Sequence, residues 1–475
     1  MTAAVAAVDL GATSGRVILG HVGPNELTLT PIARFPNGPV STPSGLRWDV
    51  SALYERILSG LASAVASEPH LVSIAVDSWA VDYGLLRSGA TQPLDMVDEP
   101  FHYRDERTAD GVAAVGEVIT AAELYTRNGL QFLPFNSLYQ FAADRLAGRL
   151  DGVESALLIP DLIDYWLTGQ RFAERTNAST TGLLSVADRE WDDDLIARLG
   201  LPREIFPTLI DAGSPVGGLL PDVARRVGAD VEVNTVGSHD TASAVAGIPA
   251  TDPDFAYISC GTWSLVGVEL ERPVLTEAGR AANFTNEGGV DGRVRYLHNV
   301  MGLWVLSESV RTWEAAGEVI DLPELLRAAA QVAEPVSVFD PDDPRFLTPG
   351  DMPARIASWL TEHGQRVPGS RAAMVRSILE SLADAYARTI DTARELTGKT
   401  ISVIHLVGGG SLNTLLCQLT ADRTGLPVIA GPVEATAIGN VLVQARAQGL
   451  VSGDLETLRA IVARSAAQVR FLPRA

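Results

Sequence analysis

The hydrophobic pattern at the start of the chain predicts two strands joined by a glycine turn. Residues 4–9 are almost all apolar, GATSG follows, and residues 16–20 are again mostly apolar. Short apolar runs bounded by glycine are typical of buried strands. Further strands are expected over residues 26–34 and 71–77.

Helical periodicity is expected in three places. Asp49 occupies the N-cap position of an amphipathic helix predicted over residues 50–66. Between residues 108 and 200, Leu, Tyr and Ala recur at three- and four-residue spacing, which predicts an inserted helical layer. Residues 371–396 repeat Met, Ile, Leu and Tyr along one stripe, so we expect a long helix with that stripe in the core.

The second half of the chain repeats the opening pattern of the first. VDLGATSGRVILG, from Val8, matches ISCGTWSLVGVEL, from Ile258, as strand, glycine turn and strand. A weaker echo links GSHDTASAVAG to GPVEATAIGNV, from Gly431. We therefore expect two α/β domains of similar build. Their boundaries are predicted at residues 1–248 and 254–448, joined by a short Pro- and Asp-bearing linker, with a C-terminal helix and tail at residues 449–475.

Length and charge limit the class of protein. A chain of 475 residues exceeds the roughly 250 to 300 residues at which a single core stops growing, so two domains are natural. The formal charge of −21 argues against a nucleic-acid partner, because phosphate-backbone binding needs clustered Lys and Arg. An anionic nucleotide is still compatible, since ATP binds as a magnesium complex held by backbone N–H groups.

The positions of cysteine and histidine and the hydropathy of the chain argue against other classes of protein. Only Cys260 and Cys417 occur, neither in a CxxC pair, and no histidine has a partner at metal-ligand spacing, so no zinc site is expected. The N-terminal residues MTAAVAAVDLG lack the basic region of an export signal. No apolar run approaches the roughly 20 residues of a membrane span. We expect a cytoplasmic protein with no membrane partner.

The two glycine turns are candidate phosphate loops. In the first, two glycines permit close backbone approach, so the N–H groups of the turn and the hydroxyls of Thr13 and Ser14 could hold phosphate oxygens. Asp9, at the end of the strand, could hold Mg²⁺ through water. The second turn, CGTWS at residues 260–264, offers the same groups. Either turn alone is compatible with a plain β-turn, but two in equivalent places favour a grip on the phosphates of a nucleotide.

Two further turns are candidates for chemistry. VGGGS, at residues 407–411, follows an apolar strand and precedes Asn413, a plausible N-cap; it could seat adenine or ribose, or be a plain strand-to-helix turn. In GSHDT, Asp240 would stand at the start of a helix, where it could accept the proton of a substrate hydroxyl that attacks phosphorus. The alternative makes Asp240 a helix cap and His239 a core histidine.

Taken in order, these motifs resemble those of the FGGY family of carbohydrate kinases. The set is DLGATSGR, SWAVDYGLL, HYRDERT, GSHDTASA, CGTWSL, NEGG, NVMGLW, LVGGGSLNTLLCQL and AGPVEATAIGN. The match runs from about Val5 to Gln444, and longer strings such as QFLPFNSLYQ argue against chance agreement. The resemblance implies an α/β fold of two actin-like, RNase H-type domains with a central cleft that takes ATP·Mg²⁺ and a sugar.

The resemblance also implies roles for individual residues. The γ-phosphoryl group of ATP would pass to the 1-hydroxyl of a small ketose, with L-rhamnulose favoured, as a step of rhamnose catabolism. Asp240 would be the proton acceptor, and His239 would bind the sugar. The cofactor contacts would be Ala12, Thr13, Ser14, Gly15, Arg16, Thr262, Asn299, Ser307 and Gly409.

Two positions depart from the family's pattern. Members commonly carry Gln where Ser307 stands, and the shorter side chain reduces the reach of a nucleotide contact there. In SWAVDYG, Ala80 stands where members acting on L-rhamnulose usually have Gly, close to the expected path of the sugar. One methylene is worth roughly 1 to 3 kcal/mol of discrimination in a tight pocket, so the preferred ketose could differ. Nearby Asp82 and Arg104 offer hydrogen-bonding groups for a polyol, although Arg104 and Asp105 could equally be a solvated surface pair.

Other functions remain open from the sequence. Fuculose, ribulose or xylulose are alternative substrates within the same enzyme class. A non-catalytic module that responds to a sugar or nucleotide is an alternative from another class. Either a monomer or a homodimer is compatible with the sequence, and Cys260 beside the second turn raises the question of sensitivity to oxidation.

Overall fold

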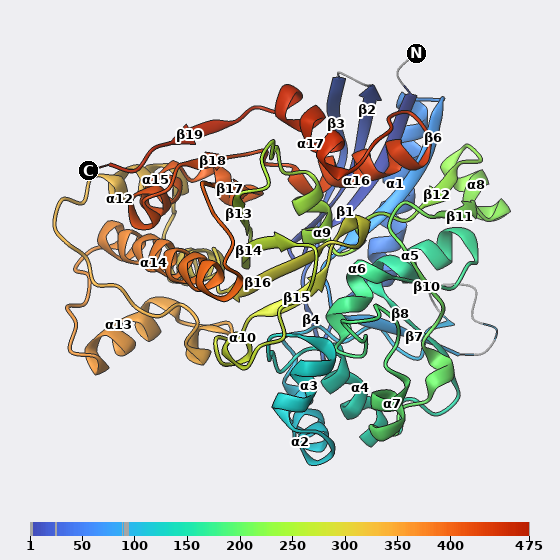
Figure 1. Ribbon diagram of the computed structural model, residues 1–475, viewed down its shortest axis with the longest axis horizontal. Helices are drawn as coiled ribbons and strands as arrows, with labels where there is room; N and C mark the ends of the chain where they lie inside the picture. Colours follow the sequence, from blue (N-terminus) through green and yellow to red (C-terminus); the bar gives the residue numbers. More distant parts are fainter. Residues whose placement is uncertain (1–2, 24–25, 88, 90–94, 475) are drawn as a thin grey trace. The chain divides into compact units, whose positions relative to one another are not determined.

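The computed structural model describes residues 3–23, 26–87, 89 and 95–474, and the chain forms two compact units (Figure 1). Unit 1 comprises Met1–Thr251, Leu270–Tyr296 and Ala435–Ala466, and unit 2 comprises Asp252–Glu269, Leu297–Glu434 and Ala467–Ala475. Residues 1, 2 and 475 of the predicted terminal segments lie outside the described residues.

The helices are α1 (Val50–Ser67), α2 (Ala109–Val118), α3 (Ala121–Asn128), α4 (Ser137–Leu146), α5 (Ile159–Thr168), α6 (Arg175–Ala178), α7 (Asp193–Arg198), α8 (Pro221–Val227), α9 (Asp240–Ala246), α10 (Glu277–Ala281), α11 (Trp304–Ala315), α12 (Leu322–Ala330), α13 (Met352–Glu362), α14 (Arg371–Thr397), α15 (Thr414–Thr424), α16 (Ala435–Ala447) and α17 (Leu455–Ser465).

The strands are β1 (Ala3–Leu10), β2 (Ser14–Gly23), β3 (Glu26–Pro36), β4 (Val40–Thr42), β5 (Gly45–Arg47), β6 (Leu71–Ser78), β7 (Tyr83–Arg87), β8 (Val153–Leu158), β9 (Ala173–Glu174), β10 (Leu209–Ile210), β11 (Pro215–Gly218), β12 (Glu232–Asn234), β13 (Phe255–Cys260), β14 (Ser264–Leu270), β15 (Thr285–Gly288), β16 (Val294–Val300), β17 (Val403–Val407), β18 (Val428–Ala430) and β19 (Val469–Phe471).

The main sheet of unit 1 has the strand order β11-β12-β6-β1-β2-β3. β1 pairs with β2 in antiparallel fashion and with β6 in parallel fashion, and the register sets Asp9 opposite both Arg16 and Asp77. Directly paired residues project from the same face of a sheet. The opening hairpin predicted from the sequence is confirmed, and its register brings three ionisable side chains to one place.

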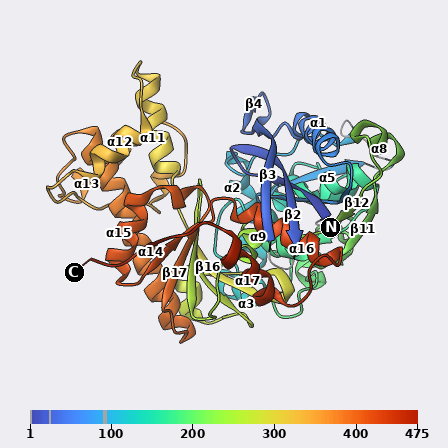
Figure 2. The same cartoon turned by 90° about the horizontal axis from the view of Figure 1, so that it is seen from above.

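Helices cover both faces of this sheet. α1 packs where Gly60 lies against Val17, and α16 packs where Gly20 lies against Val441. Val17 and Gly20 are three residues apart on β2, so they face opposite sides of the sheet. Figure 2 shows α1 on one side of β2 and β3 and α16 on the other. Asp49 caps α1 as predicted, because its side chain accepts a hydrogen bond from Ala52 N at 3.0 Å.

The stretch predicted to be helical between residues 108 and 200 also contains the short strands β8 and β9. β8 pairs antiparallel with β7 in a two-stranded sheet, and a core cluster that includes Phe141, Leu183 and Phe206 surrounds it. The apolar run at the end of β8 has the length of a core strand, but the stretch as a whole follows a helical pattern.

In unit 2 the sheet order is β14-β13-β17-β18-β19, with β13 antiparallel to β14 and parallel to β17. The predicted long helix is present as α14. Asn413 caps α15 as expected, since its side chain accepts from Leu416 N at 3.1 Å. Within the part of the chain that the structure describes, we find no helix with the length and hydropathy of a membrane span.

α16 belongs to unit 1 although it follows unit 2 in sequence. It packs on α9 through glycine, because a Cβ at Gly439 would lie 1.8 Å from Ser243 O and one at Gly247 would lie 2.2 Å from Ala435 O. The two segments linked by the weak sequence echo are therefore neighbours in one unit. The units do not follow a single cut near residue 250; the predicted boundaries of 1–248 and 254–448 stay a prediction.

Candidate active site

A cluster of acids lies where β1 and β6 end in unit 1. Asp9 is buried with 3% of its surface exposed, and Arg16 Nη2 lies 3.6 Å from Asp9 Oδ2. Asp77 is fully buried, and Asn440 donates to its Oδ2 at 2.5 Å. Burial, and next the charge of Asp9, raises the pKa of Asp77 well above its usual range. A proton on Asp77 avoids two adjacent negative charges, which suits a site with a single charged carboxylate at the end of β1.

Asp240 is the first residue of α9, and 29% of its side chain is exposed. Ser78 N donates to Ser238 O at 2.9 Å, which fastens the 238–240 turn to the end of β6. Burial, followed by the charge of Asp9, raises the pKa of Asp240 to about 7, although Thr241 Oγ1 donates to it at 3.1 Å. A carboxylate that titrates near neutrality fits a general base. The alternative of Asp240 as the helix cap is wrong, because His239 occupies the N-cap position.

Glu174 forms hydrogen bonds with the turn that carries Asp240. Its carboxylate is completely buried and accepts from Ser238 N at 3.1 Å and Ser238 Oγ at 2.9 Å. It also accepts from Thr176 N, Thr176 Oγ1 and Asn177 N at 3.0, 2.5 and 3.2 Å. One buried carboxylate therefore joins the start of α6 to the turn that carries Asp240, and this limits the freedom of the turn.

His239 is buried beside a charged pair. Its Nδ1 lies 2.9 Å from Arg295 Nη2 and 3.4 Å from Glu287 Oε2, and its Nε2 lies 3.5 Å from Asp240 Oδ1. Burial, and then the charge of Arg295, lowers the pKa of His239 well below its usual range. His239 is thus a neutral imidazole that touches the carboxylate of Asp240, so the alternatives of core histidine and site residue are compatible.

Ala80 lies at a strained turn. Asp82 N donates to Ala80 O at 2.9 Å across Val81, whose φ is 68°. This is a γ-turn with a β-branched residue in the left-handed region, where such a residue is an outlier. Ser137 Oγ donates to Val81 O at 2.6 Å and secures the turn. Strain of this kind persists only where surrounding contacts impose it.

Asp82 supplies much of that support. Its carboxylate accepts from Trp48 Nε1 at 2.6 Å, Trp79 Nε1 at 3.1 Å, Tyr103 N at 3.1 Å and Gln140 Nε2 at 3.0 Å. Burial raises its pKa to about 6. The carboxylate therefore holds together the surrounding aromatic side chains, among them Trp48 and Trp79, whose ring centroids lie 4.1 Å apart at an interplanar angle of 35°. Its role as a sugar ligand stays a prediction.

Arg104 lies beside these aromatic rings. Its backbone N–H donates to His102 Nδ1 at 3.0 Å, and its guanidinium carbon lies 5.2 Å from the centre of the Tyr103 ring. Asp105 instead accepts from Leu46 N and Arg107 N, so it caps the neighbouring turn. The alternative of a solvated surface pair is not supported, since the carboxylate of Asp105 bonds backbone groups.

The first glycine turn is tightly built. Gly11 N donates to Ser14 O at 3.0 Å, and Asn37 Nδ2 donates to Gly11 O at 2.8 Å. A Cβ at Gly15 would lie 2.2 Å from the Phe35 ring, so packing alone requires glycine at that position. Thr13 is exposed at the tip and Ala12 is half-buried beside it. The turn therefore presents a fixed backbone and an exposed hydroxyl.

Unit 2 gathers its predicted nucleotide contacts around the second turn. Trp304 N donates to Thr262 O at 3.1 Å, so α11 begins at that turn; Ser307 is exposed one turn along α11, and Asn299 precedes it on β16. A Cβ at Gly410 would lie 2.2 Å from Cys260 Sγ, whereas Gly409 is exposed with open space around it. The loops after β13 and β17 are therefore in contact.

The thiol of Cys260 faces the interior of unit 2. It lies 3.5 Å from Ser264 Oγ and 3.6 Å from Tyr386 Oη, and burial raises its pKa. A buried thiol with a raised pKa is a poor nucleophile. These features favour a structural role for the thiol of Cys260.

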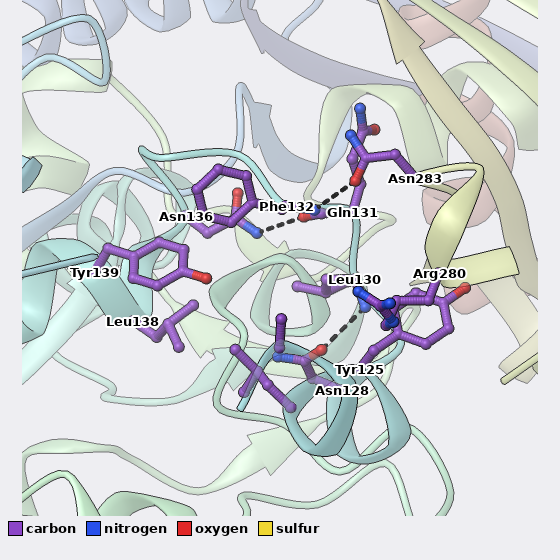
Figure 3. Close-up of a pocket in the computed structure, with 12 residues that line it drawn as sticks. Tyr125, Asn128, Leu130, Gln131, Phe132, Asn136, Leu138, Tyr139, Arg280 and Asn283 are labelled. Atoms are coloured by element: carbon purple, nitrogen blue, oxygen red, sulfur yellow. Dashed lines mark hydrogen bonds between the residues drawn. The ribbon is translucent and has the colours of Figure 1, made fainter. Parts of the chain in front are cut away.

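A separate pocket of about 120 Å³ lies in unit 1 (Figure 3). Its walls come from α3, α4 and the loop between them, with Arg280 and Asn283 at one side. Phe132 N donates to Asn283 Oδ1 at 2.9 Å, and Asn136 Nδ2 donates to Gln131 O at 3.2 Å. None of the predicted site residues lines it, and the side-chain amides of Asn128, Asn136 and Asn283 bond backbone groups.

Both halves of the sequence match domains of one protein family. Residues 4–247 match the N-terminal domain, and residues 256–448 the C-terminal domain, of the FGGY family of carbohydrate kinases. The chain belongs to the FGGY family of carbohydrate kinases. It is therefore an enzyme that phosphorylates a sugar, and the alternative of a non-catalytic module is not favoured.

Several relatives are similar along almost the whole chain. A rhamnulokinase of Pectobacterium carotovorum subsp. carotovorum is 42% identical over 475 residues, which cover 99% of this chain and 93% of that protein. A rhamnulokinase of Bacteroides thetaiotaomicron is 40% identical, with 97% of this chain and 93% of that protein covered.

Solved structures of sugar kinases share the fold. A ligand-bound xylulose kinase from Lactobacillus acidophilus has a TM-score of 0.79 at 16% identity, with 99% of this chain and 94% of that chain covered. A xylulose kinase from Rhodospirillum rubrum has a TM-score of 0.78 at 18% identity, with 99% of this chain and 94% of that chain covered. These likenesses confirm the predicted two-domain, actin-like α/β fold.

Several residues of this FGGY kinase's site escaped the sequence analysis. Trp48, Glu174 and Arg295 lie outside the quoted motifs, while Trp79 and Glu287 lie inside SWAVDYG and NEGG without having been singled out. Their partners are distant in sequence, for example 64 positions between Glu174 and Ser238. The one usable signal was a charged residue inside an apolar strand, such as Arg295 in VRYL, because buried charges are paired.

Proposed function

We propose that this FGGY kinase transfers the γ-phosphoryl group of ATP to the 1-hydroxyl of L-rhamnulose, giving L-rhamnulose 1-phosphate and ADP in rhamnose catabolism. The observation that carries the proposal is identity of 40 to 42% to rhamnulokinases over nearly the full chain. The sugar oxygen forms a bond to phosphorus, the bond from that phosphorus to the bridging oxygen of ADP breaks, and the hydroxyl proton passes to the carboxylate of Asp240.

The residues present fit ATP and Mg²⁺. Mg²⁺ commonly uses one or two protein carboxylates together with water and substrate phosphates, so the buried carboxylate of Asp9 suits a water-mediated ion. The exposed tip at Thr13 and the open backbone at Gly409 leave room for a nucleotide. When bound, ATP·Mg²⁺ supplies the phosphoryl group and neutralises its charge.

The protein's own residues position and deprotonate the sugar. Asp240, with a pKa of about 7, is ionised in a large fraction of molecules at neutral pH and can take the hydroxyl proton. Glu174 fixes the turn that carries it. The proposed sugar contacts are Ala80, Asp82, Arg104 and His239, together with the ring of Trp79. Thr262, Asn299 and Ser307, with residues 12–16 and Gly409, are the proposed contacts of the nucleotide.

A second candidate keeps the chemistry and changes the ketose to fuculose, ribulose or xylulose. The observation that favours it is the methyl group of Ala80, held half-buried on a strained turn where L-rhamnulose-specific members usually have glycine. The methyl group narrows the space for a sugar at that backbone. Such a change alters the ratio of kcat/KM between two substrates by about tenfold to 200-fold at most.

A ketose panel tests the proposal. Purified protein is given ATP, Mg²⁺ and each of L-rhamnulose, L-fuculose, L-ribulose and D-xylulose, and ADP and the sugar 1-phosphate are quantified. We expect the highest kcat/KM with L-rhamnulose in both the wild-type protein and Ala80→Gly. A higher kcat/KM with another ketose in both proteins would remove the L-rhamnulose assignment.

A further inference from the structure

The imidazole of His239 has two competing neighbours at one nitrogen. Arg295 Nη2 lies 2.9 Å from Nδ1, and Glu287 Oε2 lies 3.4 Å from the same atom. A guanidinium only donates hydrogen bonds and stays charged at any ordinary pH, whereas a carboxylate only accepts. The nearer contact therefore requires the lone pair of Nδ1, and the single imidazole proton must sit on Nε2.

Arg295 cannot easily leave this position. It has no exposed surface, its Nε donates to Gly288 O at 2.9 Å, and its Nη1 lies 3.1 Å from Glu287 Oε2. The planar guanidinium of Arg295 is thus held on three sides, by the carbonyl of Gly288, the carboxylate of Glu287 and the imidazole of His239. Glu287 neutralises the guanidinium, so the buried charge is paired.

We propose that Arg295, held by Glu287, is a positioning residue that fixes His239 as the neutral Nε2–H tautomer, so that the imidazole donates a hydrogen bond on the side of Asp240. The groups that face the ring are Arg295 on β16, Glu287 on β15 and Asp240 on α9, with Thr176 of α6 accepting from the His239 backbone N–H. Among these, Arg295 opposes a second proton on the ring, and burial opposes it further.

In this tautomer the N–H of His239 is a hydrogen-bond donor beside the carboxylate of Asp240, which is an acceptor. Nε2–H lies 3.5 Å from Asp240 Oδ1, so an N–H and a carboxylate point into the same space. A 2-ketose carries its 1-hydroxyl next to the oxygen of C2. The 1-hydroxyl can donate to Asp240 while the C2 oxygen accepts from His239. This recognition rests on the proposed function, and it assigns the substrate class as a sugar with an acceptor oxygen beside the attacking hydroxyl.

Nitrogen-15 NMR of the histidine rings in the full-length protein, without sugar or nucleotide, tests the tautomer independently of activity. His239→Gln identifies the resonances. We expect a protonated Nε2 and an unprotonated Nδ1, unchanged between about pH 5 and 8. A protonated Nδ1, or an imidazolium in this range, would overturn the inference. The spectrum is informative even if the protein phosphorylates no ketose, in which case the proposed function alone fails.

Substitutions of the charged pair provide the second readout. In Arg295→Met, Nδ1 loses its donor and faces Glu287, so we expect the proton to move to Nδ1. We also expect kcat/KM for the ketose to fall about tenfold or more, with KM for ATP changed less than about twofold. In Glu287→Gln, which keeps the guanidinium and remains informative if Arg295→Met does not fold, we expect Nε2–H to persist. Loss of Nε2–H in Glu287→Gln, or its retention in a folded Arg295→Met, would contradict the proposal.

Discussion

At Asp240, opposing influences set the charge of the carboxylate. Burial and the charge of Asp9 raise its pKa, while the hydroxyl of Thr241 and the guanidinium of Arg295 lower it, and the result is about 7. Below this value the carboxyl is protonated and cannot accept the proton of a sugar hydroxyl. The activity of the enzyme is therefore tied to the environment of one side chain.

The pH dependence of kcat/KM reports this environment. For wild-type protein, we expect kcat/KM for the ketose to rise through an inflection near pH 7 and to fall about tenfold per unit well below it. Thr241→Val removes a donor to the ionised form, so the inflection should move to higher pH. A flat profile, or the same inflection in both proteins, would show that Asp240 does not govern the rate.

Among the helices, the close contact of α16 with α9 fixes the position of the helix that begins at Asp240. The backbones approach so closely that a Cβ at Gly439 would lie 1.8 Å from Ser243 O. Backbone atoms cannot rotate away as side chains can, so the helices must separate or shift. Because α9 begins at Asp240, a shift of α9 also displaces the carboxylate.

Gly439→Ala tests this contact. We expect the free energy of unfolding to fall by up to about 2 kcal/mol, because overpacking costs roughly 1 to 3 kcal/mol and outweighs the roughly 1 kcal/mol that Ala gains over Gly in a helix. Gly116→Ala is the matched control, since Gly116 is also helical but has open space around it, and it should be neutral or slightly stabilising. Equal stability of the two variants in urea unfolding would contradict the packing described.

The sequence predicted elements better than their assembly. The caps at Asp49 and Asn413 and the two glycine turns carry local signals, since each uses residues within a few positions. Arg295 was missed because its contact with His239 forms only in the folded chain, and Glu174 because its bonds to Ser238 join positions 64 residues apart. The stretch that contains β8 was assigned to a helical layer because most of its apolar residues follow helical spacing. No periodicity could tell that α16 covers the sheet of unit 1.

At the scale of the whole molecule, unit 1 is built from three separate parts of the chain. Residues 435–466 supply α16 and α17, and their apolar side chains form one core cluster with Val5, Ala7, Val22 and Leu27 of the first sheet. A chain that stopped near residue 250 would leave that face of the sheet exposed to water.

Expression of residues 1–251 alone tests this dependence. We expect the fragment to bind a hydrophobic dye and to lack a cooperative thermal transition, because α16 and α17 no longer cover β1 and β2. Full-length protein should show neither feature. A monomeric fragment with a sharp transition would mean that the first sheet does not need the C-terminal helices.

Asp240→Asn tests whether Asp240 takes the hydroxyl proton during phosphoryl transfer to L-rhamnulose. Asparagine keeps the size of the side chain but cannot take a proton, so we expect L-rhamnulose-dependent ADP release to fall about 10²- to 10⁴-fold, with KM for ATP nearly unchanged. The control is Asp222→Asn, an exposed carboxylate in α8, which should retain the wild-type rate. Wild-type turnover in Asp240→Asn would contradict the account.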